Sequence, residues 1–141
     1  MTDVATFRSA VLCEIEGAVY FREQKAEQYP DDDRNQRCAE NLMVLQRDIA
    51  ELQEDDPVLR KCFEAYRDKH QAAGNLESAW LHDADLWFPR DDVSGYGVSK
   101  PIFSRYGFDC PESGDAQKFL VSLSEEIESW EFEDLRLDEL V

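Results

Sequence analysis

Apolar residues recur at helical spacing between positions 38 and 52, and this pattern constrains the fold more than any other feature of the chain. Steps of four and three residues separate Cys38, Leu42, Leu45, Ile49 and Leu52. Such steps place all the side chains on one helix face, as in a heptad seam. The seam lasts two heptads, whereas a coiled-coil dimer usually needs about three or four. We therefore expect it to pack inside a helical bundle.

Helical spacing also marks the segment before this seam, where a first helix is predicted from about Val4 to Gln28. The dipeptide Tyr29-Pro30 ends it, because the residue before a proline is disfavoured in helical geometry. Three aspartates at 31–33 follow, and we expect them to cap the next helix and to favour its dipole. The inward stripe of the first helix consists of Val4, Phe7, Val11, Ile15, Ala18 and, at its polar end, Arg22.

Three further helices are expected in the rest of the chain. Asp56-Pro57 predicts the start of the third, because it combines a capping residue with proline at the first helical position. A short fourth helix is predicted within 75–89, and a last one begins at Ser113 or Asp115. Their inward faces are Leu59, Cys62, Phe63 and Tyr66 in the third, Leu76, Ala79, Trp80, Ala84 and Trp87 in the fourth, and Ala116, Phe119, Leu120, Leu123, Ile127 and Trp130 in the last.

These elements predict a single all-α domain over residues 1–141, an irregular bundle of four to five helices. A long loop, 89–111, precedes the last helix and contains three prolines and three glycines. We expect it to be structured, because aromatic side chains such as Tyr96 and Phe103 need burial. A small hairpin within 96–108 would make the fold marginally α+β.

The net charge of the chain favours some classes of binding partner and disfavours others. The chain carries 32 acidic against 15 basic residues, a formal charge of −17 at pH 7. Such a field disfavours binding to nucleic acid and to anionic membranes, and it speeds encounter with basic proteins. No apolar run approaches the roughly 18 residues that span a bilayer, and the N-terminus does not resemble a signal peptide. A cytoplasmic protein is expected.

The densest acidic stretch is 125–139, where eight acidic residues accompany only Arg136. This charge repels itself, and a structural surface normally mixes signs. Two interpretations stand: a solvated surface that keeps the protein soluble, or a face that binds a basic protein. Glu125, Glu126, Glu128 and Glu133 are expected to point outward from the last helix. The candidate partner-binding residues are Glu125, Glu126, Glu128, Glu131, Glu133, Asp134, Asp138 and Glu139.

A second candidate site combines the fourth helix with the loop 89–111. Cations are scarce in this half of the chain, and three of them lie in the loop, where they can anchor a carboxylate or phosphate. Alternatively they pair with Asp91, Asp92 and Asp109 and only hold the loop in place. The candidate pocket residues are Trp80, Trp87, Arg90, Tyr96, Lys100, Arg105 and Tyr106.

Sequence motifs for catalysis, metal binding or cofactor binding are missing, so no catalytic residue, metal ligand or cofactor is predicted. The four cysteines lie 25, 24 and 48 residues apart without a C-x-x-C, which favours reduced, structural thiols. Cys13, Cys38 and Cys62 are expected on apolar helix faces.

These features favour a non-catalytic cytosolic protein that binds a basic protein partner through its acidic C-terminal face. An antitoxin, an immunity protein, an inhibitor and a DNA mimic all fit this description. The alternative is a small-molecule-binding protein or enzyme that uses the second candidate site.

Overall fold

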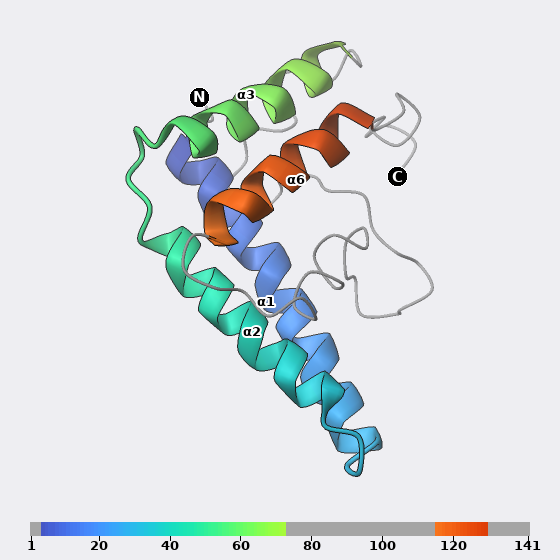
Figure 1. Cartoon of the computed structure of the whole chain (residues 1–141). Coiled ribbons are helices and arrows are strands. Elements are labelled where there is room, and N and C mark those ends of the chain that lie inside the picture. Colours follow the sequence, from blue (N-terminus) through green and yellow to red (C-terminus); the bar gives the residue numbers. More distant parts are fainter. Residues whose placement is uncertain (1–3, 73–114, 130–141) are drawn as a thin grey trace.

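The computed structural model describes residues 4–72 and 115–129, which form four α-helices (Figure 1). These are α1 (Val4–Gln28), α2 (Arg34–Ala50), α3 (Pro57–Ala72) and α6 (Asp115–Ser129). No strand occurs within the described ranges. The prediction of an all-α bundle is confirmed, and α1 has the bounds that its sequence predicted.

Helices α1 and α2 form an antiparallel hairpin, and the predicted seam lies between them. Cys38, Leu42, Leu45 and Ile49 are fully buried in α2. Leu52 follows the end of the helix and is partly buried against the core. Two hydrogen bonds also connect the helices. Gln46 Nε2 donates to the Leu12 carbonyl over 3.3 Å, and Arg22 Nη1 donates to Asn35 Oδ1 over 3.1 Å.

Helices α3 and α6 form the second pair, at the end of the hairpin opposite the α1–α2 turn (Figure 1). Gln117 Nε2 at the start of α6 donates to Asp56 Oδ2 at the start of α3 over 2.9 Å. Near the other ends, Lys69 Nζ donates to the Glu128 carbonyl over 2.7 Å. The two helices therefore run parallel.

One hydrophobic core joins the two pairs. At its centre the Phe7 ring of α1 lies 5.8 Å from that of Phe63 and 5.2 Å from that of Tyr66, measured between centroids. The tilted arrangement is one that aromatic pairs favour. Arg8 of α1 also donates to the Leu52 carbonyl, which holds the connection between α2 and α3 against the hairpin.

Two of the predicted helix caps have different outcomes. Asp56 Oδ1 accepts hydrogen bonds from the backbone N–H groups of Val58 and Leu59, both at 3.0 Å, so the predicted cap of α3 is confirmed. At the start of α2 the N-cap position belongs to Asp33, whose side chain makes no capping hydrogen bond. The carboxylate of Asp32 turns instead to Arg34 and accepts from its backbone N–H over 3.1 Å.

The remaining predictions fall outside the described residues. They are the fourth helix within 75–89, the loop 89–111 with its hairpin, and the segment after Ser129. The assignment of 1–141 to a single domain therefore stays a prediction.

Candidate functional site

The α6 part of the acidic face stands on a helix that is firmly held from its other side. Phe119, Leu120, Leu123 and Ile127 are fully buried there. Glu125 and Glu128 are exposed, as expected from their positions between the buried ones. Packing of the apolar stripe therefore fixes the direction in which these two carboxylates point.

Glu126 was expected to point outward and does not do so fully. Its side chain is half-buried, because it lies next to Ile127 and three residues after Leu123, at the border of the packed face. We remove it from the exposed set. On α6, the acidic face then consists of Glu125 and Glu128.

The carboxylates of Glu125 and Glu128 take part in no ion pair among the described residues. The ion pairs in this part of the chain lie elsewhere, between Arg34 and Asp32, Arg37 and Asp33, Arg47 and Asp48, and Arg67 and Asp68. Lys69 approaches Glu128 only at its backbone carbonyl. Within the described ranges, both side chains are therefore exposed and without an ion-pair partner.

The other predicted site residues belong to 73–114 and 130–141, which lie outside the described part of the chain. This concerns Glu131, Glu133, Asp134, Asp138 and Glu139 of the acidic face, and Trp80, Trp87, Arg90, Tyr96, Lys100, Arg105 and Tyr106 of the predicted pocket.

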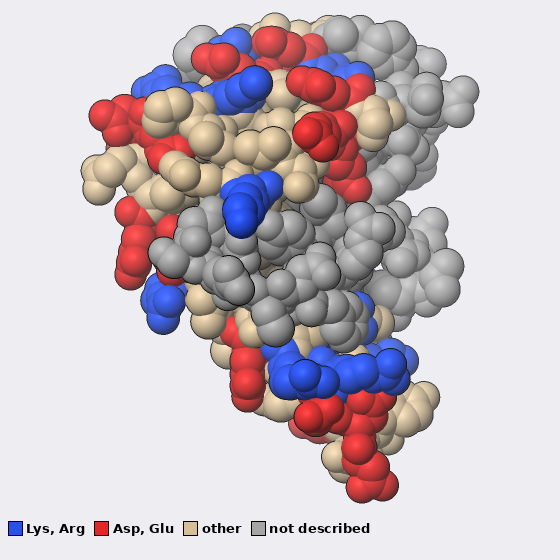
Figure 2. Space-filling model, viewed as in Figure 1, with Lys and Arg blue, Asp and Glu red and all other residues tan. Residues whose placement is uncertain are grey.

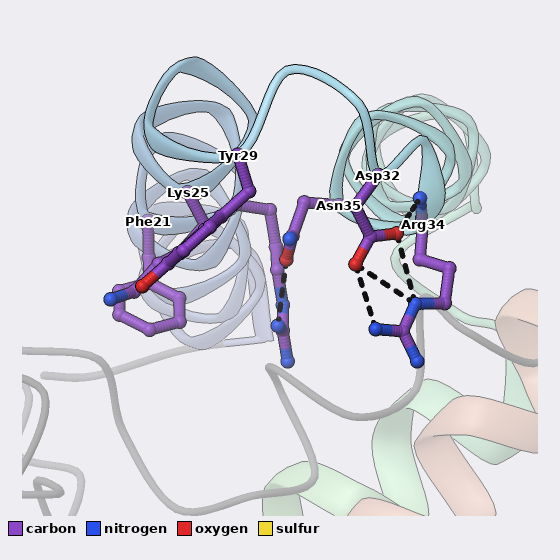
Figure 3. Close-up of a pocket in the computed structure, with 7 residues that line it drawn as sticks. Phe21, Lys25, Tyr29, Asp32, Arg34 and Asn35 are labelled. Atoms are coloured by element: carbon purple, nitrogen blue, oxygen red, sulfur yellow. Dashed lines mark hydrogen bonds and ion pairs between the residues drawn. The ribbon is translucent and has the colours of Figure 1, made fainter.

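A pocket of about 480 Å³ lies at the end of the hairpin where α1 turns into α2 (Figure 3). We call it the hairpin-end pocket. From α1 and the residue after it come Phe21, Arg22, Lys25 and Tyr29. From the start of α2 and the turn before it come Asp32, Arg34 and Asn35.

The side chains that line the hairpin-end pocket carry more positive than negative charge. Asp32 and Arg34 form a two-pronged ion pair, with Nη2 to Oδ2 at 2.7 Å and Nε to Oδ1 at 2.9 Å. The hydrogen bonds from Arg34 lower the pKa of the Asp32 carboxyl to about 2, so it is ionised at neutral pH. This pair is electrically satisfied, and the cations Arg22 and Lys25 account for the remaining positive charge of the lining.

Arg22 reaches across to α2. Besides its bond to Asn35, it lies close to the Cys38 thiol, whose pKa is raised by burial while the neighbouring guanidinium partly offsets the rise. Lys25 Nζ is 3.4 Å from Gln28 Oε1 and 5.7 Å from the centroid of the Phe21 ring. Lys25 therefore has an amide and a ring as neighbours, and it makes no ion pair within the part of the chain that the structure describes.

Sequence reasoning missed the hairpin-end pocket. The one signal for it was the inward stripe of α1, which turns polar at Arg22. It also missed Glu14, which is only 4% exposed. Glu14 lies seven residues after Phe7 and four before Ala18, so helical spacing alone places it on the buried face.

The cysteine prediction is partly wrong. Cys38 and Cys62 are buried, but Cys13 is exposed. Burial raises the pKa of the Cys62 thiol to about 12, with a smaller opposing effect of a hydrogen bond involving Ser124. A thiol held in its neutral form is a poor nucleophile, so Cys62 acts as a core residue.

Within residues 4–72 and 115–129, no group of three or more His, Cys, Asp or Glu side chains is arranged to hold a metal ion. None of the helices in these ranges has the length and apolar content needed to cross a membrane. Comparison of the chain with protein-family models, with curated proteins and with solved structures finds no match.

Proposed function

We propose that this protein is a non-catalytic, cytoplasmic interaction protein that binds a basic protein partner through the acidic surface of α6 and the acidic segment that follows it. The observation that carries the proposal is the pair Glu125 and Glu128. Both are exposed and without an ion-pair partner among the described residues, on a helix whose opposite face is buried in the core.

Electrostatics explains how such a face would act. Acidic residues that crowd on 125–139 repel one another, and a cationic surface that covers them relieves this repulsion. Long-range attraction also guides a basic partner during diffusion, so charge complementarity acts mainly on the association rate. An antitoxin, an immunity protein, an inhibitor and a DNA mimic all fit this mode of action.

The test begins with a pull-down from the native source at low and at physiological salt. Association with the purified partner is then followed by stopped-flow. The Glu125→Gln/Glu128→Gln double variant should associate more slowly than the wild type and show a weaker salt dependence, because fewer charges guide the encounter.

A matched control separates position from total charge. The Glu16→Gln/Glu40→Gln variant removes the same charge from exposed sites on α1 and α2. It should keep the wild-type association rate. Equal rates and salt slopes for the wild type and both variants would show that the α6 charge serves solubility only.

A further inference from the structure

The lining of the hairpin-end pocket has a net positive charge, whereas the chain as a whole has a net negative charge. The chain has a net charge of −17, yet this pocket is lined by three cations and one carboxylate. Figure 2 shows Lys and Arg side chains in a band across the lower part of the molecule, above the acidic side chains at the α1–α2 turn. The pocket therefore provides a local site for a negative group.

The three cations of the pocket differ in how far their charge is already paired, and this difference favours the binding of an anion. Arg34 is neutralised by Asp32. Lys25 is half-buried and has no ion-pair partner in the described residues, with only Gln28 within hydrogen-bonding reach of its ammonium group.

Aromatic side chains give the same pocket an apolar wall. Tyr29 is 57% exposed and is among the few large hydrophobic side chains of the described residues that face solvent to this degree. In Figure 3, Phe21, Lys25 and Tyr29 lie together on the α1 side, whereas Asp32 and Arg34 lie on the α2 side. A ring placed on this wall has a cation beside it.

The size of the pocket indicates what kind of ligand fits. About 480 Å³ lies within the range of roughly 300–1,000 Å³ that is typical of small-molecule sites. We propose that the hairpin-end pocket binds a small aromatic anion, with its phosphate or carboxylate group at Lys25 and Arg22 and its ring against Phe21 and Tyr29. This binding is independent of the acidic face on α6.

Titrations of the full chain with phenyl phosphate, inorganic phosphate and benzyl alcohol test the proposal, with binding followed by NMR shifts of the protein. Phenyl phosphate should bind at least about tenfold more tightly than either fragment, because it uses both the charged and the aromatic contacts. The shifts should centre on residues 21–35. Equal affinity for benzyl alcohol, or no binding of phenyl phosphate at millimolar concentration, would overturn the proposal.

Two variants resolve the two contacts. Lys25→Gln should weaken the binding of phenyl phosphate and of inorganic phosphate by about tenfold, since it removes a charge-assisted hydrogen bond. Tyr29 lies outside the helices, and Tyr29→Ser should weaken the binding of phenyl phosphate and leave the binding of inorganic phosphate unchanged. Lys61→Gln, an equal loss of charge at an exposed position on α3, is the matched control and should bind like the wild type. If Lys25 only complements the carbonyl end of α1, Lys25→Gln will lower the melting temperature slightly and leave phenyl phosphate binding intact, which contradicts the proposal.

Discussion

At the scale of the residue, position on a helix determines which side chains stabilise the fold and which remain available. Leu45 and Met43 are two residues apart on α2, yet Leu45 is fully buried and Met43 is 40% exposed. The same contrast separates Ile127 from Glu125 on α6. Stability and binding therefore depend on different residues of the same helices.

Leu45→Ala should lower the free energy of unfolding by about 2–5 kcal/mol, because the shorter side chain leaves a cavity in the core. Met43→Ala is the matched control and should change the free energy of unfolding by only about 0.5 kcal/mol or less, because Met43 lies at an exposed position. Urea denaturation of the three proteins gives both values. Equal stabilities for Leu45→Ala and the wild type would mean that the seam does not face the core.

At the scale of the element, both helix pairs combine a buried apolar face with polar contacts between their helices. The hairpin of α1 and α2 is held by the apolar seam. The parallel pair of α3 and α6 adds a polar contact at its start, where Asp56 both caps α3 and accepts a hydrogen bond from Gln117 of α6. Asp56 thus connects a local element to its packing partner, although the two residues are 61 positions apart.

Asp56→Ala should destabilise the protein by about 1–2 kcal/mol, since it removes a helix cap and a hydrogen bond between helices. Asp55→Ala, at the neighbouring exposed position, should have little effect. A double-mutant cycle with Gln117→Ala measures the coupling between α3 and α6. Zero coupling would show that Asp56 acts as a cap alone.

Periodicity predicted the elements well because it depends on which residues occur at steps of three and four. It placed α1, the seam of α2 and the inward face of α3 correctly. It failed at the borders of the stripes, where Glu126 is half-buried and Cys13 is exposed, because a neighbouring helix decides how far burial extends. The hairpin-end pocket depends on how the end of α1 lies against the start of α2, and that arrangement is not contained in either pattern.

At the scale of the whole molecule, the net charge of −17 acts on stability as well as on binding. Like charges repel more strongly in the compact state than in the unfolded chain, so an excess of one sign lowers the free energy of unfolding. The exposed ion pairs, such as Arg37 with Asp33, oppose this effect only weakly, because such pairs contribute about 0–1 kcal/mol each. Repulsion should therefore dominate the response of the free protein to salt.

Raising NaCl from about 10 mM to about 150 mM should increase the free energy of unfolding at pH 7, because the screening length falls from about 30 Å to about 8 Å. Urea denaturation at each salt concentration measures the increase. It should be smaller for the Glu125→Gln/Glu128→Gln variant, which has less repulsion to screen, and larger for Arg60→Gln/Lys61→Gln, which loses two exposed cations of α3. A decrease of the free energy of unfolding with salt would mean that attraction between opposite charges outweighs repulsion. The acidic surface would then carry no net repulsion for a basic partner to relieve.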